Sequence, residues 1–292
     1  MARPQDRLPD NAPGDVYVDR TCIDCGTCRH IASDVFAEAG DHSYVATQPA
    51  DPAALHRALM AAVACPTNSI GTMTRADVKA AVAAFPEEVL PGVRYCGFAS
   101  PDSYGASAWL VVRPDGNVLI DSPRAAAPLM KRVEALGGVR WMVLTHRDDV
   151  ADHAIWARRF GCERIIHRAD GSAVPGAERF VDGDDPVALA PDLTLIPLPG
   201  HTRGSMGLLF RDEVLFSGDH LWGRRDGDPG AGLAAGRGVC WYDWPTQIRS
   251  MERLRTWRFG HVLPGHGAPW HGGADAKPAA LDALLHRMRA AA

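Results

Sequence analysis

The stretch Thr145–His153 reads THRDDVADH and directly follows the apolar run Val139–Leu144. It places two histidines and three aspartates within nine residues, at the end of an expected strand. Imidazole and carboxylate groups bind metal ions, whereas core packing does not select so many polar side chains. Neighbouring residues cannot surround an ion by themselves, so this stretch predicts a metal site completed by ligands from elsewhere in the chain.

Three later motifs each follow a short apolar run and carry a further candidate ligand. They are PGHT at 199–202, SGDH at 217–220 and PGHG at 264–267, with the candidates His201, Asp219 and His266. In this order the four motifs resemble the metallo-β-lactamase superfamily over about the last two hundred residues. Strands alternate with helices, which predicts an α/β fold, and the resemblance implies a four-layer αβ/βα sandwich with metals at one edge.

The resemblance also implies two sets of ligands with one shared carboxylate. They are His146, Asp148, His201 and Asp219 for one metal, and Asp152, His153, Asp219 and His266 for the other, with Asp219 bridging. The family pattern is HxHxDH, but here Asp148, or alternatively Asp149, replaces the second histidine, and two extra residues precede Asp152. Asp152 alternatively caps the next helix, and Asp148 alternatively supports a ligand. The donors leave Zn, Fe and Mn open, and the added carboxylate favours Fe or Mn relative to an all-histidine site.

A hydrolytic interpretation follows from a site with two ions. Such ions lower the pKa of a bridging water and polarise a carbonyl or phosphoryl oxygen. Asp152 is the expected catalytic residue, which takes the proton and returns it to the leaving group. His220 either touches substrate or lies behind the ligands. The aromatic stretch 240–244 forms either core or a pocket wall, and Gly223–Gly238, with Arg224, Arg225 and Arg237, is either a lid for an anionic substrate or a solvated loop.

A second metal-binding pattern lies near the N-terminus. Cys22, Cys25 and Cys28 have CxxCxxC spacing, which lets three thiolates from one loop hold three corners of a cubane, and Cys65 is followed by Pro66. Residues 15–74 resemble the single-cluster bacterial-type ferredoxins, which implies one 4Fe-4S cluster held by these four cysteines. A structural zinc site is the alternative.

Length and composition set the broad class. A chain of 292 residues with 46% hydrophobic residues is long enough for about two domains with buried cores. The net charge of −4 gives no sign of a nucleic-acid partner, and no apolar run approaches membrane-spanning length. The N-terminus lacks the apolar core of a secretion signal, and cluster-type cysteines suit a reducing compartment, so a cytoplasmic protein is expected.

These signals predict the following organisation. Residues 1–15 are expected to be flexible, 16–74 to form an α+β ferredoxin-like domain, 75–92 a linker, and 93–292 the metallo-β-lactamase-fold domain. Helices are expected at 53–64, 76–85, 125–136, 152–160, 245–257 and 277–289. Strands are expected at 16–19, 107–112, 118–121, 139–145, 164–167, 193–198, 214–216 and 261–263.

The function implied by the resemblance is a metal-dependent hydrolase of an ester, thioester or lactone, acting on a small molecule. The alternative is an iron-dependent oxidoreductase that resembles the diiron oxygen or nitric oxide reductases, or the persulfide dioxygenases. In that alternative the 4Fe-4S cluster passes electrons to the second site, and a redox partner protein is implied. The cluster has no evident electron-transfer role beside a purely hydrolytic site, which is the main argument for the oxidoreductase.

Overall fold

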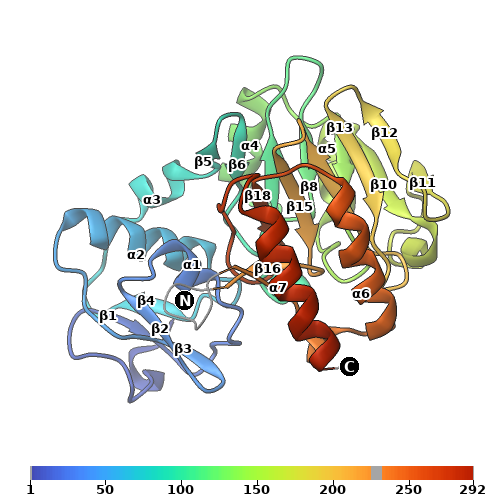
Figure 1. Cartoon of the computed structure of the whole chain (residues 1–292). Coiled ribbons are helices and arrows are strands. Elements are labelled where there is room, and N and C mark those ends of the chain that lie inside the picture. The colour runs from blue at the N-terminus through green and yellow to red at the C-terminus, as the bar shows by residue number, and fades with distance from the viewer. Residues whose placement is uncertain (1, 225–231, 292) are drawn as a thin grey trace. The chain divides into compact units, whose positions relative to one another are not determined.

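The computed structural model describes residues 2–224 and 232–291, and the chain divides into two compact units. The first comprises Met1–Arg140 and Ala154–Gly161, and the second comprises Trp141–His153 and Cys162–Ala292. Both combine helices with strands (Figure 1). Residues 225–231, which include part of the expected lid and Arg225, lie outside the described residues. Within the described ranges, no helix has both the length and the apolar character needed to cross a membrane.

The cysteine-rich part of the first unit is built from two strand pairs and two helices. They are β1 (Val16–Val18) with β4 (Ile70–Thr72), β2 (Phe36–Ala39) with β3 (His42–Val45), α1 (Thr27–Ile31) and α2 (Pro52–Ala64). Helix α2 begins where the Asp51 carboxylate accepts hydrogen bonds from the backbone N–H groups of Ala53 and Ala54. It ends at Cys65, directly before Pro66, because proline cannot continue a helix.

The segment that precedes β1 is packed against the strands, in contrast to the flexibility expected of it. Asn11 is buried, and its side-chain oxygen accepts hydrogen bonds from the backbone N–H groups of Val18 and Val45 at 3.0 Å each. Its amide nitrogen donates to the Val18 carbonyl at 2.8 Å. One buried side chain thus satisfies backbone groups of two strands, which holds this segment in place.

The rest of the first unit is an antiparallel meander with three short helices. The elements are β5 (Glu87–Leu90), β6 (Val93–Tyr95), β7 (Trp109–Val111), β8 (Val118–Ile120), α3 (Lys79–Ala84), α4 (Ala127–Ala135) and most of α5 (His153–Phe160). The cysteine-rich part packs on this meander: the His30 ring lies edge-on to Tyr95 at 5.6 Å and to Trp109 at 6.4 Å. Arg57 of α2 also pairs with Glu87 of β5.

The second unit contains a three-stranded parallel group and a five-stranded sheet. The parallel group is β9 (Trp141–Val143), β10 (Glu163–His167) and β11 (Arg179–Val181). The sheet has the order β12 (Val187–Ala190), β13 (Leu193–Pro197), β14 (Met206–Phe210), β15 (Val214–Gly218) and β18 (His261–Pro264), and β16 (Trp222–Gly223) pairs with β17 (Leu233–Ala234). Every residue of β14 and β15 is buried, as expected for strands covered on both faces.

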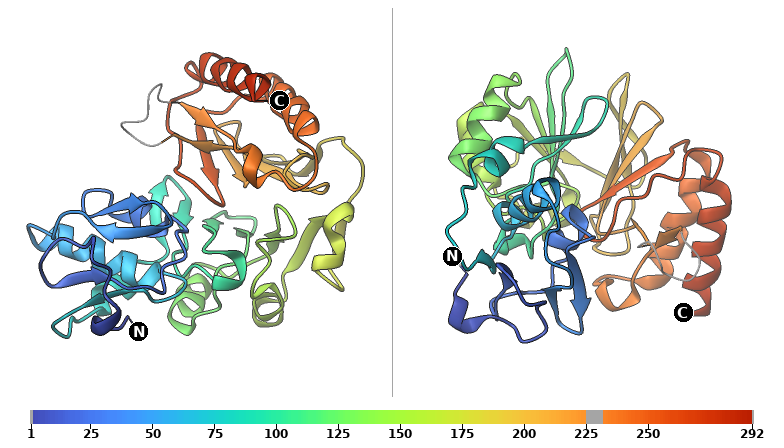
Figure 2. Two further views of the ribbon diagram at one scale, coloured as in Figure 1. Left: turned by 90° about the horizontal axis from the view of Figure 1, so that it is seen from below. Right: turned by 90° about the vertical axis from the view of Figure 1, so that its left-hand side faces the viewer.

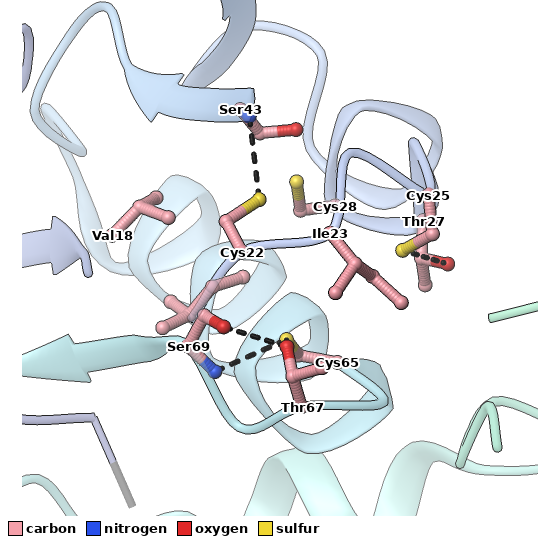
Figure 3. Close-up of a pocket in the computed structure, with 11 residues that line it drawn as sticks. Val18, Cys22, Ile23, Cys25, Thr27, Cys28, Ser43, Cys65, Thr67 and Ser69 are labelled. Atoms are coloured by element: carbon pink, nitrogen blue, oxygen red, sulfur yellow. Dashed lines mark hydrogen bonds between the residues drawn. The ribbon is translucent and has the colours of Figure 1, made fainter. Parts of the chain in front are cut away.

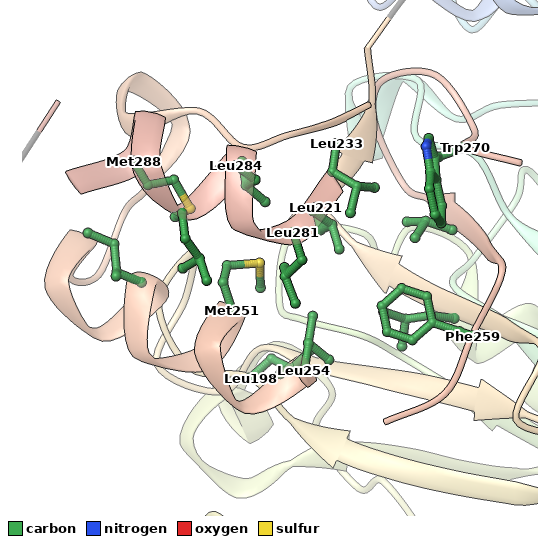
Figure 4. Packing of buried hydrophobic residues seen from close by; sticks show 14 of the residues in the cluster. Leu198, Leu221, Leu233, Met251, Leu254, Phe259, Trp270, Leu281, Leu284 and Met288 are labelled. Carbon is green, nitrogen blue, oxygen red and sulfur yellow. The ribbon is translucent and has the colours of Figure 1, made fainter. Parts of the chain in front are cut away.

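Two helices cover one face of the five-stranded sheet. α6 (Trp244–Arg253) and α7 (Lys277–Ala290) lie side by side on it (Figures 1 and 2). Figure 4 shows the apolar cluster between them and the strands, in which Met251 and Leu281 from the helices meet Leu198 and Phe259. The buried Lys277 ammonium group donates to three backbone carbonyls that follow α6. This packing holds β15 and β18, whose ends carry candidate ligands, in a fixed relation.

Several strands were not expected from the sequence. β14 follows the turn-like residues TRGS and contains a glycine, which masks its strand pattern, yet it pairs along its length with β13. β5 lies inside the expected linker. Its two glutamates are charged, as is common in edge strands, so its sequence does not show an apolar strand pattern. The sequence of such a segment does not identify it as a strand, because strand preference depends on packing against the neighbouring strands.

Candidate functional site

Polar side chains of the second unit meet where four strands end. His146 follows β9, His201 follows β13, Asp219 follows β15 and His266 follows β18. β15 and β18 are parallel, with Phe216 beside Leu263, so their carboxyl ends lie at the same edge of the sheet. The topology therefore gathers residues that are up to 120 positions apart in the sequence.

One carboxylate oxygen stands at the centre of this group. Oδ2 of Asp219 lies 3.6 Å from Nε2 of His146, 3.8 Å from Nε2 of His201 and 3.8 Å from Nε2 of His266. These distances are too long for hydrogen bonds. Ligand atoms about 2.1 Å from a shared ion lie about 3.4 Å apart at tetrahedral angles, so the spacing fits atoms that coordinate metal.

The described residues form two sets of potential ligands that share Asp219. One set is His146, His201 and Asp219, and the other is Asp149, Asp219 and His266. Oδ2 of Asp149 lies 4.0 Å from Nε2 of His146, and its Oδ1 lies 4.0 Å from Nε2 of His266. Asp149 therefore lies in the second set, for which the sequence predicted Asp152.

Asp148 lies beside the first set, on its exposed side. Its Oδ2 is 3.8 Å from Nε2 of His146 and 3.7 Å from Nε2 of His201, and its side chain is 44% exposed. The His201 imidazole lowers the pKa of this carboxyl group, with smaller contributions from His146 and Arg147. Asp148 is therefore ionised at neutral pH and accessible from solvent.

The structure does not bring Asp152 and His153 into either set. The two extra residues in the loop carry them to the start of α5. There, Nδ1 of His153 lies 3.1 Å from the guanidinium group of Arg164, which is bound by Glu178. His153 thus contacts the Arg164–Glu178 ion pair and belongs to neither ligand set.

Burial makes the two imidazoles of the first set suitable for a metal ion. His146 is 1% exposed and His201 is 2% exposed, and Nε2 of each has no hydrogen-bond partner among the described residues. A buried polar atom without a partner is costly, and a bound cation removes that cost. Burial also lowers the pKa of His146, which favours the neutral form that binds metals.

A buried carboxylate ties the loops of the first set together. Asp170, in the 3₁₀-helix Arg168–Ala173 after β10, is 1% exposed. Its Oδ2 accepts hydrogen bonds from the Arg147 backbone N–H at 3.1 Å and the Thr202 hydroxyl at 2.5 Å, and its Oδ1 accepts from the Gly204 backbone N–H at 3.1 Å. Arg147 adjoins His146 and Thr202 adjoins His201, so one side chain fixes two ligand loops.

Two glycines allow the strand ends to approach closely. A Cβ on Gly265 would lie 2.5 Å from Oδ1 of Asp219 and 2.8 Å from Oδ2 of Asp149. Gly218 has a positive φ of 53°, and a Cβ there would lie 2.5 Å from the Thr145 hydroxyl oxygen. That hydroxyl lies 3.0 Å from Nδ1 of His146, which leaves Nε2 to face Asp219.

His220 lies outside both ligand sets. It is 1% exposed, and its backbone carbonyl accepts a hydrogen bond from the Gln247 side chain at 3.0 Å. Burial lowers the pKa of its imidazole to about 3, so the ring is neutral. Neither ring nitrogen has a hydrogen-bond partner among the described residues.

The four predicted cluster ligands line one pocket in the first unit. Figure 3 shows Cys22, Cys25, Cys28 and Cys65 around a space that Val18 and Ile23 also line. Backbone N–H groups of Ser43 and Ser69 donate to the sulfurs of Cys22 and Cys65 at 3.4 and 3.3 Å. Donors directed at sulfur stabilise bound thiolates, so this donor set fits an iron–sulfur cluster.

The cysteine loop is also in contact with a segment between β6 and β7. The Thr27 hydroxyl donates to the Gly105 carbonyl at 3.0 Å, and Oγ1 of Thr27 lies 3.3 Å from the Cys25 sulfur. A Cβ on Gly105 would lie 2.8 Å from that sulfur and 2.6 Å from the Cys25 Cβ. Gly105 has a positive φ of 83°, so both its conformation and its surroundings require glycine.

Comparison with known families agrees with the two sites. Residues 18–72 match the 4Fe-4S single cluster domain of Ferredoxin I, and residues 97–231 match the metallo-beta-lactamase superfamily. The second of these parts is a metallo-beta-lactamase superfamily domain. The ferredoxin-like part precedes it, as the cysteine spacing predicted.

Solved structures share the fold. The crystal structure of DIM-1 metallo-beta-lactamase covers 70% of this chain and 97% of its own, with a TM-score of 0.54 and 16% identity. The metallo-beta-lactamase from Erythrobacter litoralis covers 70% of this chain and 91% of its own, with a TM-score of 0.50 and 19% identity. The metallo-β-lactamase fold predicted from the motifs is confirmed.

Curated relatives match part of the chain. Hydroxyacylglutathione hydrolase of Acidiphilium cryptum is 33% identical over 119 residues, which cover 39% of this chain and 49% of that protein. The enzyme of the same name from Xanthomonas campestris pv. campestris is 31% identical over 118 residues, which cover 39% of this chain and 46% of that protein. The chain therefore spans about half the length of these relatives.

Sequence reasoning about the metallo-beta-lactamase domain overlooked Asp170. It carries no motif, although it follows the end of β10 much as His146 follows β9. An aspartate shortly after a strand end was the available signal, and its partners are backbone and hydroxyl groups that only the fold brings near. Asp149 was named only as an alternative to Asp148.

Replacement of Asp170 by alanine is expected to weaken zinc binding by about 10- to 100-fold, because the loops of His146 and His201 lose their common anchor. Zinc affinity is measured by competition with a chromophoric chelator. The matched control is Asp182→Ala, which removes an exposed aspartate paired with Arg168. Equal zinc affinity in wild type and Asp170→Ala would show that Asp170 does not position the ligands.

Replacement of Gly105 by alanine is expected to reduce cluster incorporation to less than about half, because the added Cβ displaces Cys25. Iron per chain and visible absorbance of anaerobically purified protein provide the measurement. Gly40→Ala is the control, since Gly40 has a φ of 67° but open space around it. Full iron content in Gly105→Ala would contradict the close contact described here.

Proposed function

We propose that the chain is a metal-dependent hydrolase that cleaves a thioester, ester or lactone of a small molecule. One 4Fe-4S cluster is held by Cys22, Cys25, Cys28 and Cys65. The observation that carries the proposal is the approach of three imidazole nitrogens to one oxygen of Asp219 at 3.6–3.8 Å. Cysteines remain available as cluster ligands where thiols are kept reduced, which supports a cytoplasmic location.

The two ligand sets support a site for two divalent ions. His146, His201 and Asp219 would hold one ion, and Asp149, Asp219 and His266 the other. When bound, such ions supply a water of lowered pKa and polarise the substrate carbonyl. The three imidazoles and two carboxylates suit zinc, and the same donors also accept iron or manganese.

Residues of the chain supply the remaining functions. Asp148 is ionised and reaches the exposed side of the first ligand set, so we assign it the proton acceptor role that the sequence gave to Asp152. Buried His146 and His201 exclude water from one side, whereas Asp148 and His266, at 44% and 25% exposure, leave the other side open. Substrate therefore enters from the side of Asp148 and His266.

The relatives favour a thioester among the three bond types. Their name, hydroxyacylglutathione hydrolase, denotes cleavage of an acyl group from the sulfur of a thiol. The matched regions cover 39% of this chain and only about half of each relative. The proposal for this chain is therefore thioester hydrolysis, without extension to glutathione itself.

The second candidate function is an iron-dependent oxidoreductase. The observation that favours it is a cysteine pocket of cluster type in the same chain as a site rich in carboxylates. Asp148, Asp149 and Asp219 add carboxylate oxygens to the site at the strand ends. These oxygens are harder donors than imidazole nitrogens, and iron accepts such ligands well. In this alternative a redox partner protein would reduce the cluster, which would then pass electrons to the second site.

Replacement of His201 by alanine is expected to lower kcat/KM for acyl thioester hydrolysis by roughly a thousandfold, because one metal site loses an imidazole ligand. The visible absorbance of the cluster should remain, since the cysteines are untouched. His286→Ala, an exposed histidine on α7, is the control. Unchanged turnover in His201→Ala would refute the proposed active site.

A count of metals separates the two functions. Anaerobically purified protein is expected to contain about four irons from one cluster and about two zinc ions. Elemental analysis, with electron paramagnetic resonance of the reduced sample, provides the measurement. About five or six irons with little zinc, and a second iron signal, would instead support the oxidoreductase.

A further inference from the structure

Two large aromatic side chains are exposed beside the metal ligands. Trp241 is 59% exposed and Tyr242 is 51% exposed. The sequence left open whether this aromatic stretch forms core or a pocket wall. The structure separates its members: Trp244 is 7% exposed and packs in the apolar cluster, whereas Trp241 and Tyr242 face outward.

These two residues are attached directly to a ligand loop. The backbone N–H groups of Trp241 and Tyr242 both donate to the His201 carbonyl, at 2.8 and 3.0 Å. The Trp241 ring centroid lies 6.2 Å from the His201 ring centroid, at an interplanar angle of 58°. A separation of about 4.5–7 Å is the range in which aromatic rings interact. The indole is thus a direct neighbour of a metal-binding imidazole.

The aromatic pair is held from both sides. On one side, the Cys240 thiol donates to the Gly200 carbonyl at 3.1 Å. On the other, Asp243 caps α6 by accepting from the Thr246 backbone N–H at 2.8 Å, and the indole N–H of Trp244 donates to the Met288 carbonyl at 3.1 Å. A segment anchored in this way loses little freedom when a ligand binds, so its exposed rings suit recognition.

We propose that Trp241 and Tyr242 form an aromatic subsite that binds a flat, apolar substituent next to the reacting carbonyl. This inference rests on the proposed hydrolase function and narrows its substrates to thioesters with an aromatic group on the acyl side. A substituent one or two bonds from a carbonyl held near His201 reaches the indole, because the two rings are 6.2 Å apart. Stacking on indole removes apolar surface of both partners from water.

The charge distribution agrees with this class of substrate. Asp148 and Asp149 place carboxylates on the ligand loop, so a substrate with its own negative group near the carbonyl is disfavoured unless the metals neutralise it. An uncharged aromatic ring meets no such repulsion. The aromatic subsite and the ligand sets all belong to the second unit of the chain.

The experiment measures binding of two uncharged ketones, 1-phenylbutan-2-one and pentan-3-one, to the metal-loaded full chain by calorimetry; each carries CH2 in place of the thioester sulfur and cannot be hydrolysed. Wild type is expected to bind the phenyl compound about tenfold more tightly. Trp241→Ala should remove this preference, whereas Trp241→Phe should keep most of it. Met73→Ala, which removes a side chain that is 54% exposed, is the control and should change nothing.

Three outcomes would overturn the inference. The first is an unchanged phenyl preference in Trp241→Ala, and the second is no preference in wild type. The third is a wild-type dimer that becomes monomeric in Trp241→Ala during sedimentation, because the rings would then serve contact between copies. Thioester turnover is assayed separately: a phenyl preference without any turnover refutes the proposed hydrolase but supports the subsite, and turnover without a preference refutes the subsite alone.

Discussion

Three imidazole nitrogens lie within 3.8 Å of Oδ2 of Asp219. Contacts between the surrounding loops maintain these distances. Nε2 of His146 and Nε2 of His201 are buried without a hydrogen-bond partner among the described residues, which is unfavourable, and the nearby carboxylate adds negative charge to the same small volume. Divalent cations satisfy both groups at once. In the second unit, four strands end where His146, His201, Asp219 and His266 can approach one another.

The supporting residues show how the requirement is met. Gly218 and Gly265 remove side-chain volume where strand ends approach, and the Thr145 hydroxyl sets the orientation of His146. Asp170 uses both of its oxygens to bind backbone and hydroxyl donors from two loops. None of these residues touches the ion site itself. They hold the candidate ligands in place, which would reduce the conformational entropy lost when an ion binds.

The cysteine pocket depends on the rest of its unit in a comparable way. Its loop is held by Thr27 against Gly105, beyond the ferredoxin-like residues, and the His30 ring packs on Tyr95 of the meander. The ferredoxin-like part is therefore integrated with the first strands of the metallo-beta-lactamase domain rather than tethered by a flexible linker. That arrangement suits either a structural cluster, which stabilises the unit, or a redox cluster whose environment is set by both parts.

The sequence by itself determined the two families, the four cysteines and the candidates His146, His201, Asp219 and His266, because each lies in a short motif whose spacing reflects local geometry. Only the tertiary structure decided between neighbours in THRDDVADH. Asp149 turns toward Asp219, whereas His153 starts α5 and meets Arg164, and a loop with two extra residues does not reveal this in advance. Asp170 and the exposed position of Trp241 were likewise hidden, since their roles arise from contacts with residues more than 20 positions away. Local spacing encodes which residues can bind, and long-range packing decides which of them meet.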